Sequence, residues 1–111
     1  MRRECKIEVS EDNGIATIAI LGDLTASADK DMDDAYLKAR SYNPEKIMLK
    51  FDGKSRINSA GIAIVISLVM AGRESEREVF ITGVSRHFRK IFDLVGLTKY
   101  TTVAEIEEEA S

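Results

Sequence analysis

The stretch Phe51-Asp52-Gly53-Lys54-Ser55-Arg56-Ile57-Asn58-Ser59-Ala60-Gly61-Ile62 decides the fold. It contains the end of one predicted strand, a polar connection and the start of a predicted helix. The strand is expected over residues 46–51, because its apolar centre suits a central position in a sheet. The helix is expected over residues 59–74, and either Asn58 or Ser59 can cap its first turn. This order of strand, loop and helix favours a crossover unit of a parallel sheet.

The residues before this stretch predict a hairpin followed by a helix. Residues 4–21 contain an alternating strand and a mostly apolar strand, the second expected to be buried on both faces. Between them lies Asn13-Gly14, a dipeptide typical of a tight hairpin turn. After Gly22-Asp23-Leu24, apolar residues recur at the spacing of one helix face from about residue 25 to residue 40: Met32, Ala35, Tyr36 and Ala39.

The residues after it continue the alternation of strands and helices. A strand is expected over residues 79–82, then a helix capped by Ser85 with the apolar stripe Phe88, Ile91, Phe92 and Val95. Gly96 lies where a glycine commonly ends a helix. A short strand near Tyr100 and an acidic helix over residues 102–110 complete the prediction. The fold class is therefore α/β, with a mixed, mostly parallel sheet of four to five strands, an N-terminal hairpin and about four covering helices, as a single domain over residues 1–111.

The composition excludes several classes of protein. The chain has 111 residues, of which 44% are hydrophobic. It contains 16 Lys and Arg and 19 Asp and Glu, which gives a net charge of −3. A broad phosphate-neutralising surface for nucleic acid is therefore disfavoured. The apolar stretch over residues 60–71 is shorter than the ~20 residues that a spanning helix needs. The N-terminus lacks the apolar region of a signal peptide, so we expect a cytoplasmic protein that does not insert into membranes.

The chain offers few candidates for catalysis or metal binding. Cys5 and His87 are the only Cys and His, so a zinc cluster of these residues is excluded. His87 falls off the apolar face of its helix and is expected to be solvated, and Cys5 is expected to be packed rather than reactive. The run Asp29, Asp31, Asp33 and Asp34 lacks the spacing of an EF-hand loop. We therefore expect no enzyme activity, no cofactor and no metal.

Ser59 is the residue with the clearest functional potential. A phosphoserine there would lie at a helix N-terminus, which favours an anion; a simple capping role is the alternative. In the same helix, Ile62, Val65, Ile66 and Val69 are expected to face the sheet. Ile64, Leu68 and Ala71 lie roughly opposite, where charges are usual on a surface helix. That second apolar face is either a docking surface for another protein or is covered by a neighbouring helix.

Three segments resemble the STAS domains, and most closely the bacterial anti-sigma factor antagonists. Gly22-Asp23-Leu24-Thr25-Ala26 resembles the segment after the family's second strand. Residues 47–62 resemble its strand, loop and Asp-Ser-Ser/Thr-Gly-Leu/Ile signature. Residues 92–97 resemble its Phe-x-Leu-x-Gly-Leu motif. Here Asn58 replaces the usual Asp and Ala60 the usual Ser or Thr, and Asn58 keeps the capping function without the carboxylate.

The resemblance implies a protein that binds a kinase-type anti-sigma factor and so releases a sigma factor. Ser59 would be phosphorylated by that ATP-dependent serine kinase, and a phosphatase would reverse the modification. The partner-binding residues expected on this basis are Asp23, Asn58, Ser59, Ala60, Gly61, Ile64 and Leu68. Two alternatives that bind their partner constitutively stay open: an accessory subunit of an ABC-type lipid transporter and a scaffold of stress signalling.

Overall fold

The computed structural model describes residues 4–105 and contains one five-stranded sheet. The strands lie in the order β1 (Lys6–Asp12), β2 (Ile15–Leu21), β3 (Lys46–Phe51), β4 (Glu78–Val84) and β5 (Val103–Glu105). β1 pairs with β2 in antiparallel orientation, and the other three pairings are parallel. The predicted mixed sheet with an N-terminal hairpin is confirmed.

The hairpin turn has the geometry that its two residues favour. Asn13 and Gly14 both have positive φ, at 52° and 83°, which is the requirement of the type I′ turn that matches strand twist. The two residues connect Asp12 directly to its register partner Ile15. The turn therefore fixes which residues of β1 and β2 lie opposite each other.

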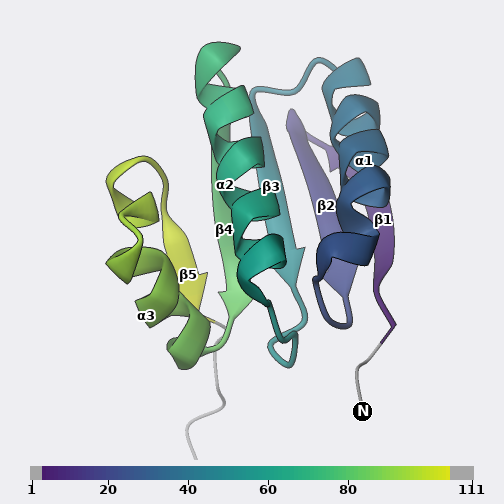
Figure 1. The fold of residues 1–111 in the computed structure, drawn as a ribbon. Helices are drawn as coiled ribbons and strands as arrows, with labels where there is room; N and C mark the ends of the chain where they lie inside the picture. Colours follow the sequence, from purple (N-terminus) through teal and green to yellow (C-terminus); the bar gives the residue numbers. More distant parts are fainter. Residues whose placement is uncertain (1–3, 106–111) are drawn as a thin grey trace, which may run out of the picture.

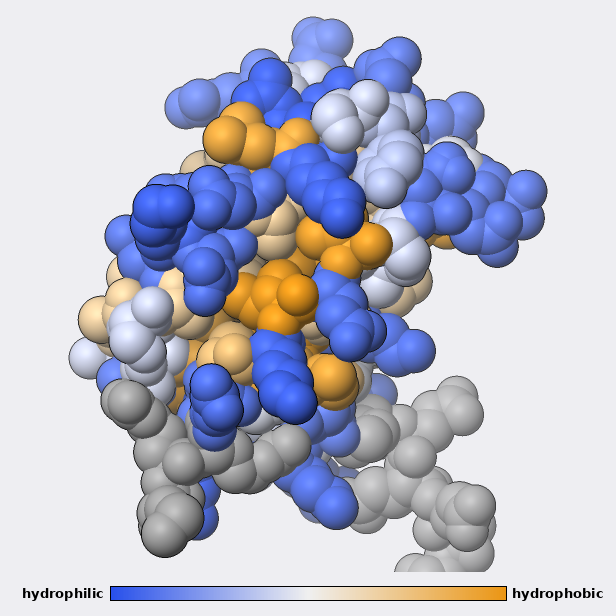
Figure 2. Space-filling view, turned by 90° about the vertical axis from the view of Figure 1, so that its right-hand side faces the viewer, coloured by the Kyte–Doolittle hydropathy of each residue, from blue (hydrophilic) through white to orange (hydrophobic). Residues whose placement is uncertain are grey.

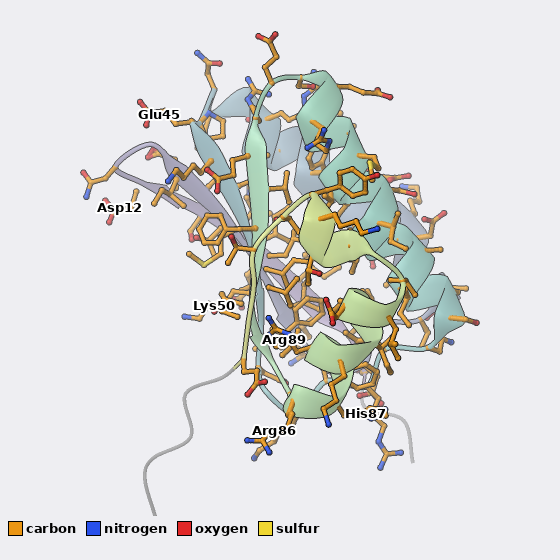
Figure 3. All side chains as sticks on the ribbon, turned by 90° about the vertical axis from the view of Figure 1, so that its left-hand side faces the viewer. Asp12, Glu45, Lys50, Arg86, His87 and Arg89 are labelled. Carbon is orange, nitrogen blue, oxygen red and sulfur yellow. The ribbon has the colours of Figure 1, made fainter. Side chains whose placement is uncertain are left out.

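The helices connect the parallel strands and all cover the same face of the sheet (Figures 1 and 3). α1 (Asp29–Ser41) follows the short 3₁₀ helix η1 (Ala26–Ala28), α2 (Ser59–Glu74) joins β3 to β4, and α3 (Arg86–Leu94) joins β4 to the 3₁₀ helix η2 (Leu97–Lys99). In α3 the Ser85 hydroxyl accepts a hydrogen bond from the Phe88 amide, and Gly96 follows with a φ of 83°. Both predicted ends of α3 are confirmed.

One face of the sheet carries the core, and the other face carries half-buried and exposed side chains. A single row crosses all five strands on the covered face: Val9, Ile18, Leu49, Ile81 and Val103. Its three central members are 0% exposed. On the uncovered face, Thr17 and Ala19 of β2 are half-buried. The prediction that β2 is buried on both faces is therefore wrong, because α1, α2 and α3 lie on the same side of the sheet.

The buried side of α2 agrees with the predicted one at Val65 and Val69, which are 0% and 1% exposed, but not at its other two members. Ile64 and Leu68 are buried, at 8% and 5% exposure, whereas Ile62 and Ile66 are only half-buried. The prediction of an exposed apolar face with Ile64 and Leu68 is wrong, because α1 and η1 pack against α2 on that side. The open alternative, a covering helix, is the correct one.

Two glycines explain this orientation of α2. A Cβ atom on Gly61 would lie 2.3 Å from the Leu24 carbonyl oxygen, and one on Gly72 would lie 2.3 Å from Cγ2 of Val79. Both glycines are buried, and they mark where the helix comes closest to its neighbours. The helix thus packs through its glycine side, which a pattern of large apolar residues does not reveal.

The C-terminal prediction is wrong in two details. The last strand is Val103–Glu105 rather than a segment near Tyr100, and residues 103–105 are not helical. The rest of the expected acidic helix lies outside the described residues. In α3, Val95 is 51% exposed although the stripe placed it with Phe92, which is fully buried. Val95 is the C-cap residue of α3. The helix therefore ends before Val95, and the Val95 side chain does not continue the buried stripe.

Candidate functional site

The candidate site lies at the edge of the sheet where β2, β3 and β4 end, here named the carboxyl edge (Figure 1). Parallel strands bring their carboxyl ends to one side, and the helices that follow begin there. Three segments meet at this edge: the connection over residues 22–25, the connection over residues 52–58 and the start of α3 at Arg86. The amide ends of the helices thus point toward solvent on one side of the molecule.

Two aspartates fasten the first two connections to each other. Asp52 accepts a hydrogen bond from the Gly22 amide at 3.1 Å and from the Lys54 amide at 2.8 Å. Asp23, which is 4% exposed, accepts one from the Arg56 amide at 3.0 Å. Because each carboxylate accepts a hydrogen bond from a backbone amide of the other connection, the loop before α2 is held against the loop after β2.

Backbone contacts continue this fastening up to the start of α2. The Leu24 amide donates to the Arg56 carbonyl at 2.9 Å, and the Asn58 amide donates to the Leu24 carbonyl at 3.3 Å. Leu24 and Ile57 form an isolated parallel bridge. The residue that begins α2 is therefore positioned by the connection after β2 as well as by its own helix.

Asn58 and Ser59 have separate roles in the structure. Asn58 is the N-cap of α2, with an extended backbone, and its side-chain oxygen accepts a hydrogen bond from the Gly61 amide at 2.9 Å. Ser59 is the first helical residue and is exposed. Within residues 4–105 its hydroxyl has no hydrogen-bond partner, since the cap is already provided by Asn58. The hydroxyl is thus presented to solvent beside a helix N-terminus.

A shallow groove of ≈ 280 Å³ runs along α2 from Ala60, the residue that follows Ser59. It lies between α2 and the segment that contains η1 and the start of α1. Its lining consists mainly of small side chains with one carboxylate and one branched residue: Ala26, Asp29, Ala60, Ala63, Ile64 and Ser67. Small side chains let a partner approach the backbone closely, and Ser59 lies one position before the first of them on α2.

The seven predicted partner-binding residues divide by exposure. Asn58 and Ser59 are exposed, and Ala60 is half-buried. The remaining four are buried: Asp23, Gly61, Ile64 and Leu68. Asp23 and Gly61 hold the loop geometry, and Ile64 contributes the edge of its side chain to the groove. The structure thus brings three of the seven to the surface around one hydroxyl.

Sequence analysis missed several residues of this edge. Asp52 was assigned only to a polar connection, although Asp followed by Gly, Lys and Ser is a typical side-chain-to-backbone turn signal. Ala63 and Ser67 follow Ser59 at intervals of four residues, so small residues at helical spacing mark the exposed side of α2. Asp29 and Ala26 come from a distant segment, and no local pattern places them near Ser59.

The other side chains considered for chemistry lie in ordinary surroundings. Burial raises the pKa of the Cys5 thiol above its ordinary value, and the carboxylates of Asp31 and Asp23 raise it further, so this thiol is not activated as a nucleophile. His87 is exposed at the start of α3, where Figure 3 shows it near Arg86, and its ring packs edge-on against Phe88. No cluster of three or more His, Cys, Asp or Glu residues in the described chain could hold a metal ion. Among residues 4–105, no helix has the length and hydropathy needed to cross a membrane.

Comparisons with known proteins agree with this fold. Residues 7–105 match the family described as "Mlab, STAS domain". The chain is 20% identical over 99 residues to the anti-sigma-B factor antagonists of Staphylococcus aureus strains NCTC 8325 and COL, covering 89% of this chain and 92% of each relative. It also resembles the crystal structure of an anti-sigma factor antagonist from Mycobacterium paratuberculosis, with a TM-score of 0.71 and 12% identity over 94% of this chain and 87% of that one. Because the family match extends through all five strands, this chain belongs to the STAS domain family.

Proposed function

We propose that this protein is an anti-sigma factor antagonist that binds an anti-sigma factor through the carboxyl edge of its sheet and so releases a sigma factor. The curated relatives of similar length carry that name, and the solved structure with the same fold is described in the same way. In this proposal the whole chain, residues 1–111, is one STAS domain that acts in the cytoplasm by binding and has no enzyme activity.

The observation that carries the proposal is the exposed Ser59 hydroxyl beside the groove on α2. Asn58 supplies the helix cap, and the Ser59 side chain contributes no hydrogen bond to the fold of the described residues. The groove that begins at Ala60 offers a partner a contact surface directly beside it. Asn58, Ser59 and Ala60 would touch the partner, and the four buried residues Asp23, Gly61, Ile64 and Leu68 would hold that surface in shape.

The finer part of the proposal is a phosphorylation switch at Ser59. A kinase-type anti-sigma factor would transfer the γ-phosphoryl group of ATP to Ser59 Oγ, releasing ADP and the hydroxyl proton. A phosphatase would return the hydroxyl by hydrolysis. The phosphate would lie at the amide end of α2, where backbone N–H groups and the helix dipole favour negative charge. The fold would tolerate it, while the partner would meet about two added negative charges.

The test is a pair of binding titrations on variants of Ser59. The tagged protein is used to purify its partner from its own cells, and the partner is identified by mass spectrometry. We expect Ser59→Asp to weaken binding of that partner ~30-fold or more, because the carboxylate loses its water without gaining a counter-charge. Ser59→Ala should bind like the wild type but accept no radiolabelled phosphate. Ser75→Asp, which adds the same charge at the other end of α2, is the matched control.

A second candidate function is a constitutive binding subunit, and two observations favour it. The matching family is described by the name Mlab as well as by its domain, and the signature around Ser59 lacks the usual Asp and the usual Ser or Thr. In that case the chain would be an accessory subunit of an ABC-type lipid transporter or a signalling scaffold. If the partner transfers no phosphate and binds Ser59→Asp as tightly as the wild type, the constitutive binding function replaces the phosphorylation switch.

A further inference from the structure

The outer edge of β1 is one of the two unpaired edges of the sheet in the described chain. β1 is the terminal strand in the sheet order and pairs only with β2. Such an edge presents backbone donors and acceptors that can pair with another strand. Its length, Lys6–Asp12, exceeds that of β5 at the other edge, of which residues 4–105 contain three residues. β1 is therefore the edge with more backbone donors and acceptors available to pair with another strand.

The hairpin register tells which backbone groups of β1 point outward. A two-residue loop is closed by a hydrogen-bonded pair, here Asp12 and Ile15. Hydrogen-bonded and non-hydrogen-bonded pairs then alternate along an antiparallel ladder. The even-numbered residues of β1 therefore bond to β2, and the odd-numbered ones direct their N–H and C=O groups outward. The outward set includes Cys5, Ile7 and Val9.

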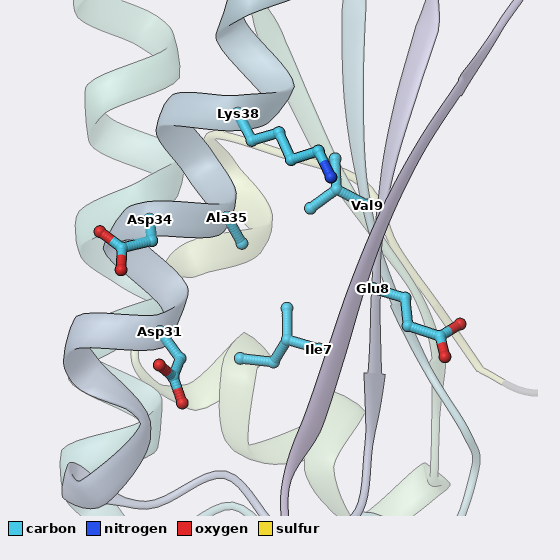
Figure 4. A pocket seen from close by; sticks show the side chains of 7 residues that line it. All are labelled: Ile7, Glu8, Val9, Asp31, Asp34, Ala35 and Lys38. Carbon is cyan, nitrogen blue, oxygen red and sulfur yellow. The ribbon is translucent and has the colours of Figure 1, made fainter.

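A groove of ≈ 500 Å³ lies between this strand and α1. Figure 2 shows apolar surface at the centre of this side of the molecule with charged side chains around it. In Figure 4, Ile7 and Val9 point from β1 toward α1, whereas Glu8 points to the other side of the strand. The side chains of Ile7 and Val9 are only half-buried. The same residues that offer outward backbone groups thus also contribute the apolar side chains of β1 to an unfilled groove whose opposite wall carries charged residues.

We propose that a second copy of this chain adds its own β1 to this edge, forming a symmetric dimer with one continuous sheet of ten strands. The two β1 strands would run antiparallel about a two-fold axis at Ile7. Ile7 would then face Ile7 of the second copy, and Cys5 would face Val9. On the uncovered face of the sheet, Lys6 would lie opposite Glu8 of the second copy, and this ion pair would occur twice.

The charges of β1 favour this register over its neighbours. A register centred at Glu8 would place the two Glu8 side chains opposite each other, and one centred at Lys6 would do the same with two lysines. A register centred at Val9 would place Ile7 opposite the charged Glu11. Like charges directly opposite destabilise a strand pair. Only the register centred at Ile7 pairs apolar with apolar and positive with negative.

The two ends of the groove are complementary in the same arrangement. In Figure 4 the Lys38 ammonium group lies toward Val9, and Asp31 lies at the Ile7 end. Asp31 also lines a second cavity together with Cys5, so it belongs to the end of the groove at which β1 begins. A two-fold axis at Ile7 exchanges these ends. The Lys38 end of one copy would therefore meet the Asp31 end of the other.

Sedimentation with charge-reversal variants tests the dimer directly. We expect the wild type to form a dimer that dissociates on dilution, and either Lys6→Glu or Glu8→Lys to raise the dissociation constant about tenfold or more, since each change acts at two symmetric positions. The double variant Lys6→Glu/Glu8→Lys should restore the dimer. Lys90→Glu, an equal charge change on α3, is the control. A wild type that stays monomeric at all concentrations, or a dimer indifferent to both single variants, overturns the proposal.

Cysteine crosslinking tests the register. Hydrogen-bonded antiparallel pairs have Cα atoms ~5.5 Å apart, a separation that a disulfide can bridge. In a Cys5→Ser background, Ile7→Cys should yield a covalent dimer under mild oxidation. Glu11→Cys, on the same side of the same strand, should not, because a two-fold axis at Ile7 does not place the two residues 11 of the dimer opposite each other. Crosslinking of Glu11→Cys but not Ile7→Cys would overturn the register. The dimer leaves both carboxyl edges open and so does not depend on the function proposed for Ser59.

Discussion

At the scale of single residues, two adjacent residues at the start of α2 have different roles: Asn58 caps the helix, and Ser59 presents its hydroxyl to solvent. A helix start needs an oxygen to accept one of its unpaired amide hydrogens. Asn58 accepts the Gly61 amide at 2.9 Å, and Ser59 stays exposed with its hydroxyl unused in the described structure. Modification of Ser59 can therefore change the surface without removing a contact on which the fold depends.

This division predicts different stability losses for two adjacent alanine substitutions. Asn58→Ala removes the cap and should lower the free energy of unfolding by about 0.5–2 kcal/mol. Ser59→Ala removes a hydroxyl that makes no hydrogen bond within the described residues and should change it by less than about 0.5 kcal/mol. Urea denaturation of both variants measures the two losses. A larger loss for Ser59→Ala would mean that Ser59, and not Asn58, caps the helix in solution.

At the scale of elements, local sequence patterns predict where helices and strands begin and end but not how they are rotated. The bounds of β3 and α2, the hairpin turn and both ends of α3 follow from apolar spacing and capping residues, which are local signals. The rotation of α2 depends on Gly61 and Gly72, whose neighbours Leu24 and Val79 come from other parts of the chain. A pattern within one element cannot contain that contact. For the same reason the groove residues Ala26 and Asp29 were not predicted.

The two glycines of α2 should differ in their tolerance of alanine. Ala favours a helix over Gly by roughly 1 kcal/mol, but the added Cβ must find space at both positions. At Gly61 the nearest atom is the Leu24 backbone oxygen, at 2.3 Å, whereas at Gly72 it is the terminal methyl carbon Cγ2 of Val79. We therefore expect Gly61→Ala to destabilise by about 1–3 kcal/mol and Gly72→Ala by clearly less. Thermal denaturation of the pair checks this order, and the reverse order would contradict the close approach at Leu24.

The end of α3 offers a test of backbone conformation without crowding. Gly96 has a φ of 83°, and nothing lies within 4 Å of the position of an added Cβ. The cost of a side chain there comes only from the left-handed backbone, about 1–2 kcal/mol for most residues. Gly96→Ala should therefore destabilise by roughly that amount, and Gly96→Asn by less, because Asn adopts this conformation more readily. Equal losses in chemical denaturation would point to a contact that the described residues do not contain.

At the scale of the whole molecule, the sheet is covered on one side only. The helices bury side chains on one face of β2, β3, β4 and β5, while the opposite face keeps half-buried residues such as Met48 and Phe80. The alternation of strands and helices predicted the parallel sheet, because each crossover needs a helix. It did not predict that all crossovers lie on the same side of the sheet. Which face a helix covers depends on contacts between elements, and that information is not contained in any single stretch of sequence.

The one-sided core predicts unequal effects for two neighbouring residues of β3. Leu49 is 0% exposed on the covered face, so Leu49→Ala should lower the free energy of unfolding by about 2–5 kcal/mol. Met48 points to the other face and is half-buried, so Met48→Ala removes less buried area and should cost at most about half as much. Denaturant titrations of the two variants provide the comparison. It is valid when the free energy of unfolding falls with denaturant concentration at the same slope in both variants. Similar losses at both positions would mean that something covers the second face in solution, and repeating the titrations over a range of protein concentrations would then tell whether that cover is another copy of the chain.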